Sequence, residues 1–461
     1  MKKYVKILAL TFAILMAISV FGCDNGSTVE SEPTTESITE SRAPEQSESE
    51  SESDNNDIAE HTHEWKDANC TDPKTCTVCG ATEGENLGGH SGGQATCLAR
   101  AKCEKCGKVY GAVGTHNFDC QNTSNEYLVS DATITAAARY YYSCSYCGEK
   151  GTGIFTSGGT IIDSLIDPYN KLFDENAEAE GFLYFTDPHP VNCESNAGFW
   201  HGREAKIEYL GKLYEASNAS FAICGGDWLN NSNSKDSAMK ILKDIRALMT
   251  DVFGEESYLV VGNHDYNYQK PSEPNYQNPD RLTKEELAEC WYPEYGKTYY
   301  TFTTKASRFY VFDSGIDWGH ENGLTALDIE QVVWLLEELA KNDDKHIVMA
   351  PHMMFISGST PHPGTAKFAE ICAAYNAREV YTYDGKTYDF SKKTGKVEYF
   401  IAGHTHADMV FEIEGIPAIL VDTMQNGDHS TADFIYVDYT EGKIYLNRVG
   451  AGADRVIDLK K

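Results

Sequence analysis

The chain contains 461 residues, which exceeds the usual size of one domain and predicts two or more. Apolar residues make up 41% and charged residues 24%, so a core can be buried, and neither a wholly disordered protein nor a polytopic membrane protein is expected. Asp and Glu number 70 against 39 Lys and Arg, and the formal charge of −31 argues against nucleic acid as the main partner.

Residues 1–22 have the organisation of an export signal. Three lysines fall within the first six residues, and an apolar run of 15 residues, Ile7 to Phe21, follows them. This run is too short to cross about 30 Å of hydrocarbon, so it predicts a signal peptide rather than a retained membrane helix.

The segment Val20-Phe21-Gly22-Cys23 resembles a bacterial lipobox, although Phe21 departs from the small or branched residue usual there. The resemblance implies that Cys23 becomes the lipidated first residue of the mature protein. We therefore expect an exported protein that is lipid-anchored to the outer face of a bacterial membrane, with plain secretion as the alternative. Acyl chains would hold it there because each buried CH₂ contributes about 0.8 kcal/mol.

Residues 23–61 form a segment rich in Ser, Glu and Thr. Between residues 24 and 60 there are 12 acidic residues and a single Arg, with almost no large apolar side chain. Such a segment cannot bury enough surface to offset its chain entropy, so it is predicted to be a disordered linker between the membrane anchor and the domains that follow.

Residues 62–150 contain an internal repeat of histidine and cysteine. His63, Cys70, Cys76 and Cys79 recur 27 residues later as His90, Cys97, Cys103 and Cys106, and a looser third unit holds His116, Cys120, Cys144 and Cys147. In the third unit Ile134 occupies the position of the first cysteine, and we expect Cys120 to compensate. Gly follows each CxxC pair, at Gly80, Gly107 and Gly148.

Each unit therefore offers three thiolates and one imidazole, which is the ligand number and chemistry of a structural Zn²⁺ site. Disulfides are the alternative for an exported protein, but three cysteines per unit would leave one thiol unpaired. The units resemble the CxxCG repeats found on the surfaces of anaerobic bacteria. In either case the cross-link is structural, because units this small cannot be stabilised by core burial alone.

Residues 151–461 have the composition of a globular enzyme, in which short apolar runs end in polar motifs. The five runs end in Thr186-Asp187-Pro188-His189, Gly225-Gly226-Asp227, Gly262-Asn263-His264-Asp265, Pro351-His352 and Gly403-His404-Thr405-His406. This is the pattern of strands whose carboxyl ends carry a site. Carboxylate, amide and imidazole donors without cysteine suit Zn²⁺, Mn²⁺ or iron, and their number exceeds what one ion needs.

The five motifs, in this order, resemble the blocks DxH, GDxx, GNH(D/E), H and GHxH of the calcineurin-like metallophosphoesterases. The resemblance covers about 300 residues. It implies an α/β, four-layer fold, in which two mixed β-sheets pack face to face between outer helices. The stretch Leu324 to Leu339 fits one outer helix, because Ile329, Val332, Val333, Leu336 and Leu339 repeat at helical spacing.

The resemblance also implies roles for single residues. One divalent ion would be held by Asp187, His189 and His406, the other by Asn263, His352 and His404, and Asp227 would bridge the two. The ions would be Mn, Fe or Zn, and two such cations can clamp a phosphoryl oxygen and share an attacking hydroxide. His264 would act on the leaving oxygen as general acid or charge stabiliser, with Asp265 orienting its ring.

These features together predict an exported, membrane-tethered phosphoesterase that hydrolyses phosphate mono- or diesters. The alternative is a catalytically inactive protein of the same fold that uses the CxxCG repeats to attach to the cell envelope or a host surface. The full set of seven ligands with His264 favours the enzyme. Residues between the motifs would select the phosphate-ester substrate, and His201, Trp228 and Tyr266 are candidates either to line the cleft or to serve packing.

Overall fold

The computed structural model describes residues 61–174, 177–189, 203–230, 233–267, 279–315, 328–357, 360–425 and 430–460. The predicted signal peptide, Cys23 and almost all of the predicted linker lie outside these ranges. Within them, no helix combines the length and the apolar character that crossing a bilayer requires. The described residues divide into two compact units, one with residues 61–68 and 72–86 and the other with residues 69–71 and those from 87 onward.

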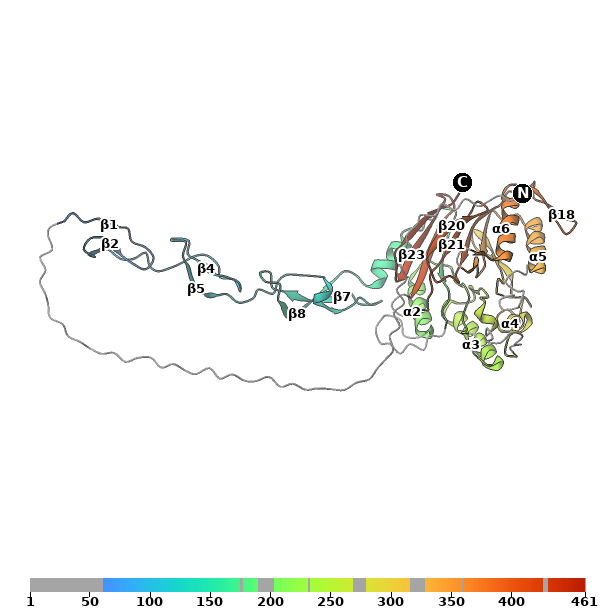
Figure 1. The fold of residues 1–461 in the computed structure, drawn as a ribbon, viewed down its shortest axis with the longest axis horizontal. Coiled ribbons are helices and arrows are strands. Elements are labelled where there is room, and N and C mark those ends of the chain that lie inside the picture. Colours follow the sequence, from blue (N-terminus) through green and yellow to red (C-terminus); the bar gives the residue numbers. More distant parts are fainter. Residues whose placement is uncertain are drawn as a thin grey trace. The chain divides into compact units, whose positions relative to one another are not determined.

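The repeats consist of short antiparallel strands around the CxxC loops (Figure 1). The first repeat holds β1 (Trp65–Lys66), β2 (Lys74–Cys76) and β3 (Thr82–Glu83), and the second holds β4 (Arg100–Lys102) and β5 (Val109–Val113). The third holds the 3-10 turn η1 (Asn125–Tyr127) with β6 (Leu128–Ser130), β7 (Ala138–Ser143) and β8 (Lys150–Ser157). Because β8 pairs with β7, the sheet of the third repeat extends to Ser157, beyond the predicted limit at residue 150.

The larger part of the chain is built on two six-stranded mixed sheets. The first has the order β11-β10-β9-β22-β23-β24, and its members are β9 (Ala179–Phe185), β10 (Phe221–Cys224), β11 (Ser257–Leu259), β22 (Thr431–Asp438), β23 (Lys443–Gly450) and β24 (Arg455–Asp458). Strands β9, β10 and β11 are parallel, whereas β22 runs antiparallel to β9. These three parallel strands are near-continuous apolar runs, as expected for strands buried on both faces.

The second sheet has the order β12-β13-β14-β19-β21-β20. Its members are β12 (Tyr300–Thr303), β13 (Ser307–Val311), β14 (His346–Ala350), β19 (Lys396–Ala402), β20 (Met409–Ile413) and β21 (Ile416–Leu420). Strands β13, β14, β19 and β21 are parallel, and β12 and β20 pair antiparallel at the two edges. Two short hairpins, β15 (Phe355–Ser357) with β16 (Thr360–Pro361) and β17 (Val380–Tyr383) with β18 (Lys386–Asp389), lie outside both sheets.

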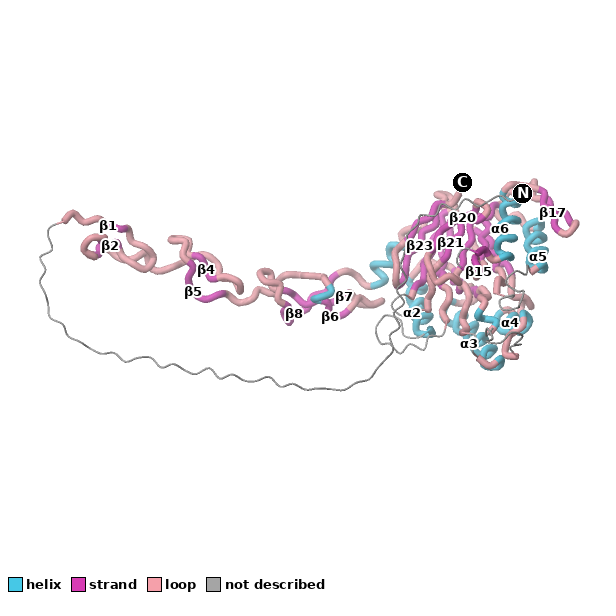
Figure 2. Tube along the Cα trace, viewed as in Figure 1, coloured by secondary structure: helices cyan, strands magenta, loops and turns pink. Residues whose placement is uncertain are grey.

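Helices complete the outer layers (Figure 2). They are the π-turn η2 (Ile162–Ile166), α1 (Asp167–Asn170), α2 (Arg203–Ala216), α3 (Lys235–Phe253), α4 (Lys284–Trp291), α5 (Ile329–Lys341) and α6 (Pro363–Asn376), whereas the 3-10 turn η3 (His264–Tyr266) belongs to the loop that follows β11. One buried cluster joins inward residues of both sheets with α2 and α3, and a second packs α5 and α6 on the second sheet. The four-layer α/β fold expected from the motifs is thus observed.

Helix α5 buries one face against the second sheet. Its described part begins after the N-cap Asp328, whose side chain accepts a hydrogen bond from the Glu330 amide, and residues 324–327 of the predicted stretch lie outside the described residues. Val332, Leu336 and Leu339 are buried as predicted, together with Leu335 and Gln331, whereas Ile329 is 60% exposed. Trp334 is partly buried and packs against the second sheet.

Candidate active site and metal clusters

Five loops converge at the carboxyl ends of β9, β10, β11, β14 and β19. Parallel strands bring their ends to the same edge of a sheet, and the two sheets present these edges together. The loops carry the seven predicted metal ligands, of which Asp187, His189, Asp227, Asn263 and His352 are buried. The remaining two, His404 and His406, are partly exposed.

The carboxylate of Asp187 lies among three imidazoles. Its Oδ1 is 3.1 Å from His406 Nε2 and 3.9 Å from both His189 Nε2 and His352 Nε2. Its Oδ2 accepts hydrogen bonds from the Thr186 hydroxyl and the His404 amide, at 2.7 and 2.9 Å. One oxygen is therefore held by the protein, and the other faces the centre of the site with donor atoms of Asp187, His189 and His406 gathered around one point.

The carboxylate of Asp227 lies between the two halves of the ligand set. Its Oδ2 is 3.1 Å from His352 Nε2 and 3.7 Å from His189 Nε2. Its Oδ1 accepts the backbone N–H of His264 at 2.8 Å. This is the position that a bridging ligand requires, since Asp227 Oδ2 lies near both His352 and His189, which the family resemblance assigns to different ions.

Backbone carbonyls fix the orientation of two of the rings. His189 Nδ1 lies 2.9 Å from Leu229 O, and His352 Nδ1 lies 2.6 Å from Gly225 O. A ring whose Nδ1–H is held by a carbonyl turns its Nε2 toward the site, which is the arrangement that orients metal-ligating histidines in proteins.

Backbone strain is concentrated in the same loops. Asp187, Asp227, His404 and His406 have positive φ values of 52°, 64°, 71° and 50°, a region that residues other than Gly rarely occupy. The neighbouring glycines allow close approach, since a Cβ at Gly262 would lie 2.1 Å from Asp227 Oδ1 and one at Gly403 would lie 2.4 Å from Asp187 Oδ2. Strained backbone of this kind clusters at functional sites, where the surrounding structure holds it in place.

The donor set fits divalent cations. Asn263 is fully buried, and neither its Oδ1 nor its Nδ2 has a hydrogen-bond partner within the described part of the chain. Burial disfavours ionisation of Asp187 and Asp227, yet the imidazoles, with His352 first, hold the pKa of both carboxyls below its usual range. Burial also opposes a proton on His352, but the two carboxylates raise its pKa to about 10. The carboxylates of Asp187 and Asp227 and the amide of Asn263 are therefore buried groups that a bound cation would stabilise.

Residues 181–408 match the family model of the calcineurin-like phosphoesterases, and the matched segment contains all seven ligands. The chain carries a calcineurin-like phosphoesterase domain. This domain is of the class of hydrolases that act on phosphoric ester bonds, and the family implies divalent metal ions at the site described above. No curated protein matches the chain significantly.

Solved structures of similar fold include two proteins from eukaryotes. A dimetal phosphatase from Danio rerio shares 15% identity, with 61% of this chain and 99% of that chain covered and a TM-score of 0.41. GAP50, the anchor in the inner membrane complex of Plasmodium, shares 13% identity, with 61% and 90% covered and a TM-score of 0.36. Likeness at this level carries no information about the substrate of the phosphoesterase domain.

The two predicted catalytic residues have different surroundings. The ring of His264 packs edge-on against His189, with 4.7 Å between centroids, and burial lowers the pKa of His264. A neutral imidazole can still donate an N–H to a leaving oxygen. Trp228 and Tyr266, candidates for lining the cleft, are buried, and the Tyr266 hydroxyl donates to Asp313. His201 lies outside the described residues.

Asp265 has a role other than the one predicted for it. Its Oδ1 accepts the amides of Trp228 and Leu229, and its Oδ2 accepts those of Asp227 and Gly262, at 2.7 to 3.3 Å. Both oxygens are therefore occupied by the backbone of the Asp227 loop. The prediction that Asp265 orients the His264 ring is wrong in this geometry, and Asp265 is a positioning residue that shapes the ligand loops.

We therefore expect Asp265→Ala to lower both thermal stability and metal content. Each buried amide left without an acceptor costs about 1–3 kcal/mol, and the Asp227 loop loses its anchor. Thermal unfolding and metal analysis measure the two effects. Asp343→Ala is the matched control, because Asp343 also accepts two backbone amides but at an exposed site where water can replace it. An unchanged metal content in Asp265→Ala would contradict the positioning role.

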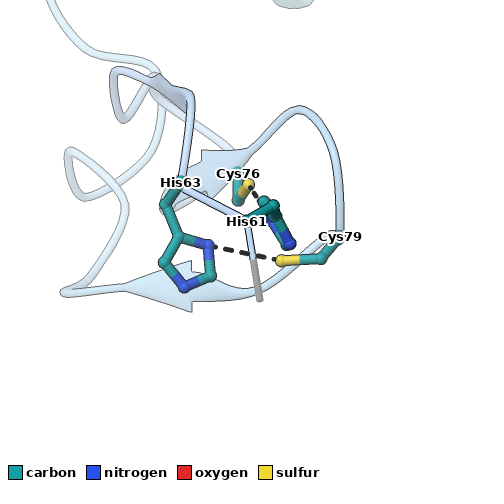
Figure 3. A group of neighbouring side chains, drawn as sticks. All are labelled: His61, His63, Cys76 and Cys79. Atoms are coloured by element: carbon teal, nitrogen blue, oxygen red, sulfur yellow. Dashed lines mark hydrogen bonds between the residues drawn. The ribbon is translucent and has the colours of Figure 1, made fainter. Parts of the chain in front are cut away.

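The repeats bring their histidines and cysteines into three clusters, and the members of each cluster differ from the predicted units. The clusters are His61, His63, Cys76 and Cys79 (site 1, Figure 3); Cys70, His90, Cys103 and Cys106 (site 2); and Cys97, His116, Cys144 and Cys147 (site 3). The donor atoms of each cluster all lie within 4.8 Å of one another. In a tetrahedral Zn²⁺ site with Zn–S bonds of about 2.3 Å, two ligand atoms lie about 3.8 Å apart, which is the distance to compare with this limit.

The grouping of ligands by repeat is therefore corrected. Cys70 and Cys97 join the cluster of the following repeat, and His61, which falls within the predicted linker, completes site 1. Cys120 is exposed, exchanges two backbone hydrogen bonds with Ser143 and is not a member of site 3. A pair of histidines two residues apart, His61 and His63, was the only sequence signal for the extra ligand.

The CxxCG loops have one conformation in all three repeats. The amides of Gly80, Gly107 and Gly148 donate to the carbonyls of Cys76, Cys103 and Cys144, and all three glycines have φ between 74° and 77°. Burial opposes ionisation of these three thiols, but loop amides and histidines lower the pKa of Cys76 and Cys103 to about 5 and that of Cys144 to about 6. The glycine permits a turn that stabilises a thiolate, the form that binds metal.

Proposed function

We propose that this chain is a metal-dependent phosphoesterase that hydrolyses phosphate monoesters or diesters at a site for two divalent ions. The observation that carries the proposal is the position of Asp227 Oδ2, 3.1 Å from His352 Nε2 and 3.7 Å from His189 Nε2. Bound there, two cations would supply Lewis-acid activation of the phosphoryl group and of a water nucleophile.

The residues of the chain would divide the remaining work. Asp187, His189 and His406 hold one ion, Asn263, His352 and His404 hold the other, and Asp227 joins the pair. Backbone carbonyls keep the rings of His189 and His352 in place, so little reorganisation is needed when substrate binds. His264 donates its ring N–H toward the leaving oxygen.

The test is hydrolysis of an aryl phosphate and of a bis-aryl phosphate by the purified full chain supplied with Mn²⁺ or Zn²⁺. We expect turnover of at least one ester, abolished by a chelator and restored by the metal, and two ions at this site. The ratio of the two rates identifies the preferred ester class. If neither ester is hydrolysed and Asp227→Asn releases no metal from the protein, the alternative of an inactive binding protein is correct.

We also propose that the domain works outside the cell, anchored to the outer face of a bacterial membrane through a lipid on Cys23, with residues 23–60 as the tether. The lipobox-like order of Val20 to Cys23 supports this proposal. The three Cys/His clusters are proposed to hold structural Zn²⁺, because their donor sets of three thiolates with one imidazole, or two of each, are those of structural zinc sites.

Replacing Cys23 by serine should remove the anchor. We expect Cys23→Ser protein in the medium or as an uncleaved precursor, whereas the parent stays in the membrane fraction with an acylated mature N-terminus. Cell fractionation and mass spectrometry of the N-terminal peptide measure this. Unchanged membrane retention of Cys23→Ser, with no acyl mass on the parent, would rule out this anchor.

A further inference from the structure

The three Cys/His clusters share one internal plan. In each, the second cysteine of the CxxC loop faces the Nδ1 atom of a histidine, for the pairs Cys79 and His63, Cys106 and His90, and Cys147 and His116, at 3.4, 3.4 and 3.2 Å. The first cysteine of the loop faces a fourth donor, for the pairs Cys76 and His61, Cys103 and Cys70, and Cys144 and Cys97, at 3.6, 3.5 and 3.6 Å. Figure 3 shows both contacts in site 1.

In sites 2 and 3 the fourth donor comes from the repeat before. Cys70 and Cys97 each follow a polar residue that starts a tight turn, and we name these segments the donor turns. In the turn of Cys97 the Thr96 hydroxyl accepts the amides of Leu98 and Ala99. In the turn of Cys70 the Asn69 side chain accepts the Thr71 amide.

The third repeat has the same turn with a different residue at the donor position. The Thr133 hydroxyl accepts the amides of Thr135 and Ala136, as Thr96 does in the second repeat. Ile134 therefore stands where Cys70 and Cys97 stand. Its side chain packs against the core of the phosphoesterase domain.

A backbone hydrogen bond recurs at each donor turn. The carbonyls of Asn69, Thr96 and Thr133 each accept one amide from the chain that leads into the next body, at 2.9 Å in every case. The amide donors are those of Leu87, Gly114 and Ile161. We name these three bonds the joints. At the first two joints the next body is a Cys/His cluster, and at the third it is the phosphoesterase domain.

We propose that Zn²⁺ in sites 2 and 3 cross-links consecutive repeats, and that the series is closed by His61 at its start and by Ile134 at its end, where a hydrophobic contact replaces the metal. His61 fits the first position because no repeat precedes it to lend a cysteine. Ile134 fits the last because the body that follows offers an apolar core rather than a CxxC loop. This inference rests on the proposal that the clusters bind zinc.

Metal counting tests whether Cys70 and Cys97, and not Cys120, are zinc ligands. In the full chain purified under reducing conditions, native mass spectrometry of Cys70→Ser and Cys97→Ser should each show one zinc ion fewer than the parent. Cys120→Ser is the matched control, because it removes a cysteine of the same segment that lies outside the clusters, and it should keep every ion. Loss of an ion in Cys120→Ser but not in Cys97→Ser would overturn the sharing.

Hydrogen exchange tests the joints. The Gly89 amide donates to the Cys70 carbonyl beside the first joint. Cys70→Ser should reduce protection of the Leu87 and Gly89 amides by about tenfold or more, and Cys97→Ser should do so at Gly114, while Ile161 stays protected in both. Ile134→Ser should expose the Ile161 amide without losing zinc, and Ile134→Leu should restore its protection. Parent protein that carries no zinc but disulfides Cys70–Cys103 and Cys97–Cys144 would refute the zinc proposal. Full zinc with unchanged exchange in the variants would refute the joints alone.

Discussion

Asp227→Asn is expected to lose metal and activity together. The Asp227 carboxylate is the group whose Oδ2 lies within reach of donors for both ions, at 3.1 Å from His352 and 3.7 Å from His189. An amide removes one negative charge from a buried site and places an N–H₂ group near cations. We expect the bound ions at this site to fall from two to one or none, and turnover to fall by about 10³-fold or more, as for the loss of several kcal/mol of electrostatic stabilisation.

Asp244→Asn is the matched control for this experiment. Asp244 is exposed on α3, where it pairs with Lys240 one helical turn away. A surface pair of this kind contributes little, so metal content, turnover and thermal unfolding should match those of the parent. If Asp227→Asn keeps both ions and loses only activity, the carboxylate acts on the substrate and not as a bridge.

The phosphoesterase fold, and the loops that carry the candidate ligands, could be predicted from the sequence because each motif is a short local pattern. Each motif directly follows an apolar strand, and parallel strands deliver their ends to one edge. Residue type alone then restricts the chemistry to hard and borderline metals. The strained φ of Asp187 or His404 could not be predicted, because strain becomes visible only once the close approach of Gly403 to the Asp187 carboxylate is seen.

The connectivity of the Cys/His clusters could not be predicted, for a reason of symmetry. The 27-residue period makes Cys70 and Cys97 equivalent positions. It is the same whether each cysteine binds metal with its own repeat or with the next one. Only the end positions break this symmetry. His61 has no counterpart 27 residues later and Ile134 interrupts the cysteine series, and these two departures are the positions that the proposed array places at its ends.

The role of Asp265 also could not be predicted from the sequence. In the sequence it adjoins His264, which suggested that the carboxylate orients the ring. In the structure the 3-10 turn η3 points the Asp265 carboxylate at the amides of Asp227, Trp228 and Leu229. Adjacent residues in a turn project in different directions, so neighbours in sequence need not be partners.

His264→Ala should slow turnover while leaving metal content near that of the parent. The backbone amide of His264 donates to Asp227 Oδ1 at 2.8 Å, and alanine keeps that bond, although a ring nitrogen of His264 also lies within 4.8 Å of donor atoms of Asp227 and His189. What is lost is the ring beside His189 and the N–H that it offers to the leaving oxygen. The rate should drop by about 10²–10⁴, the usual range for a positioned proton donor.

The dependence on the leaving group separates the roles that His264 could play. If the ring assists departure of the leaving oxygen, the loss in His264→Ala should shrink for aryl esters with acidic phenols, which depart without a proton. His346→Ala is the control, because His346 lies at the opposite end of β14 from His352, bonded to Glu398, and its loss should affect all esters alike and only slightly. A uniform large loss in His264→Ala would place its N–H on the equatorial phosphoryl oxygens. Loss of both ions would show that the ring itself is a ligand, and that the seven-residue set is incomplete.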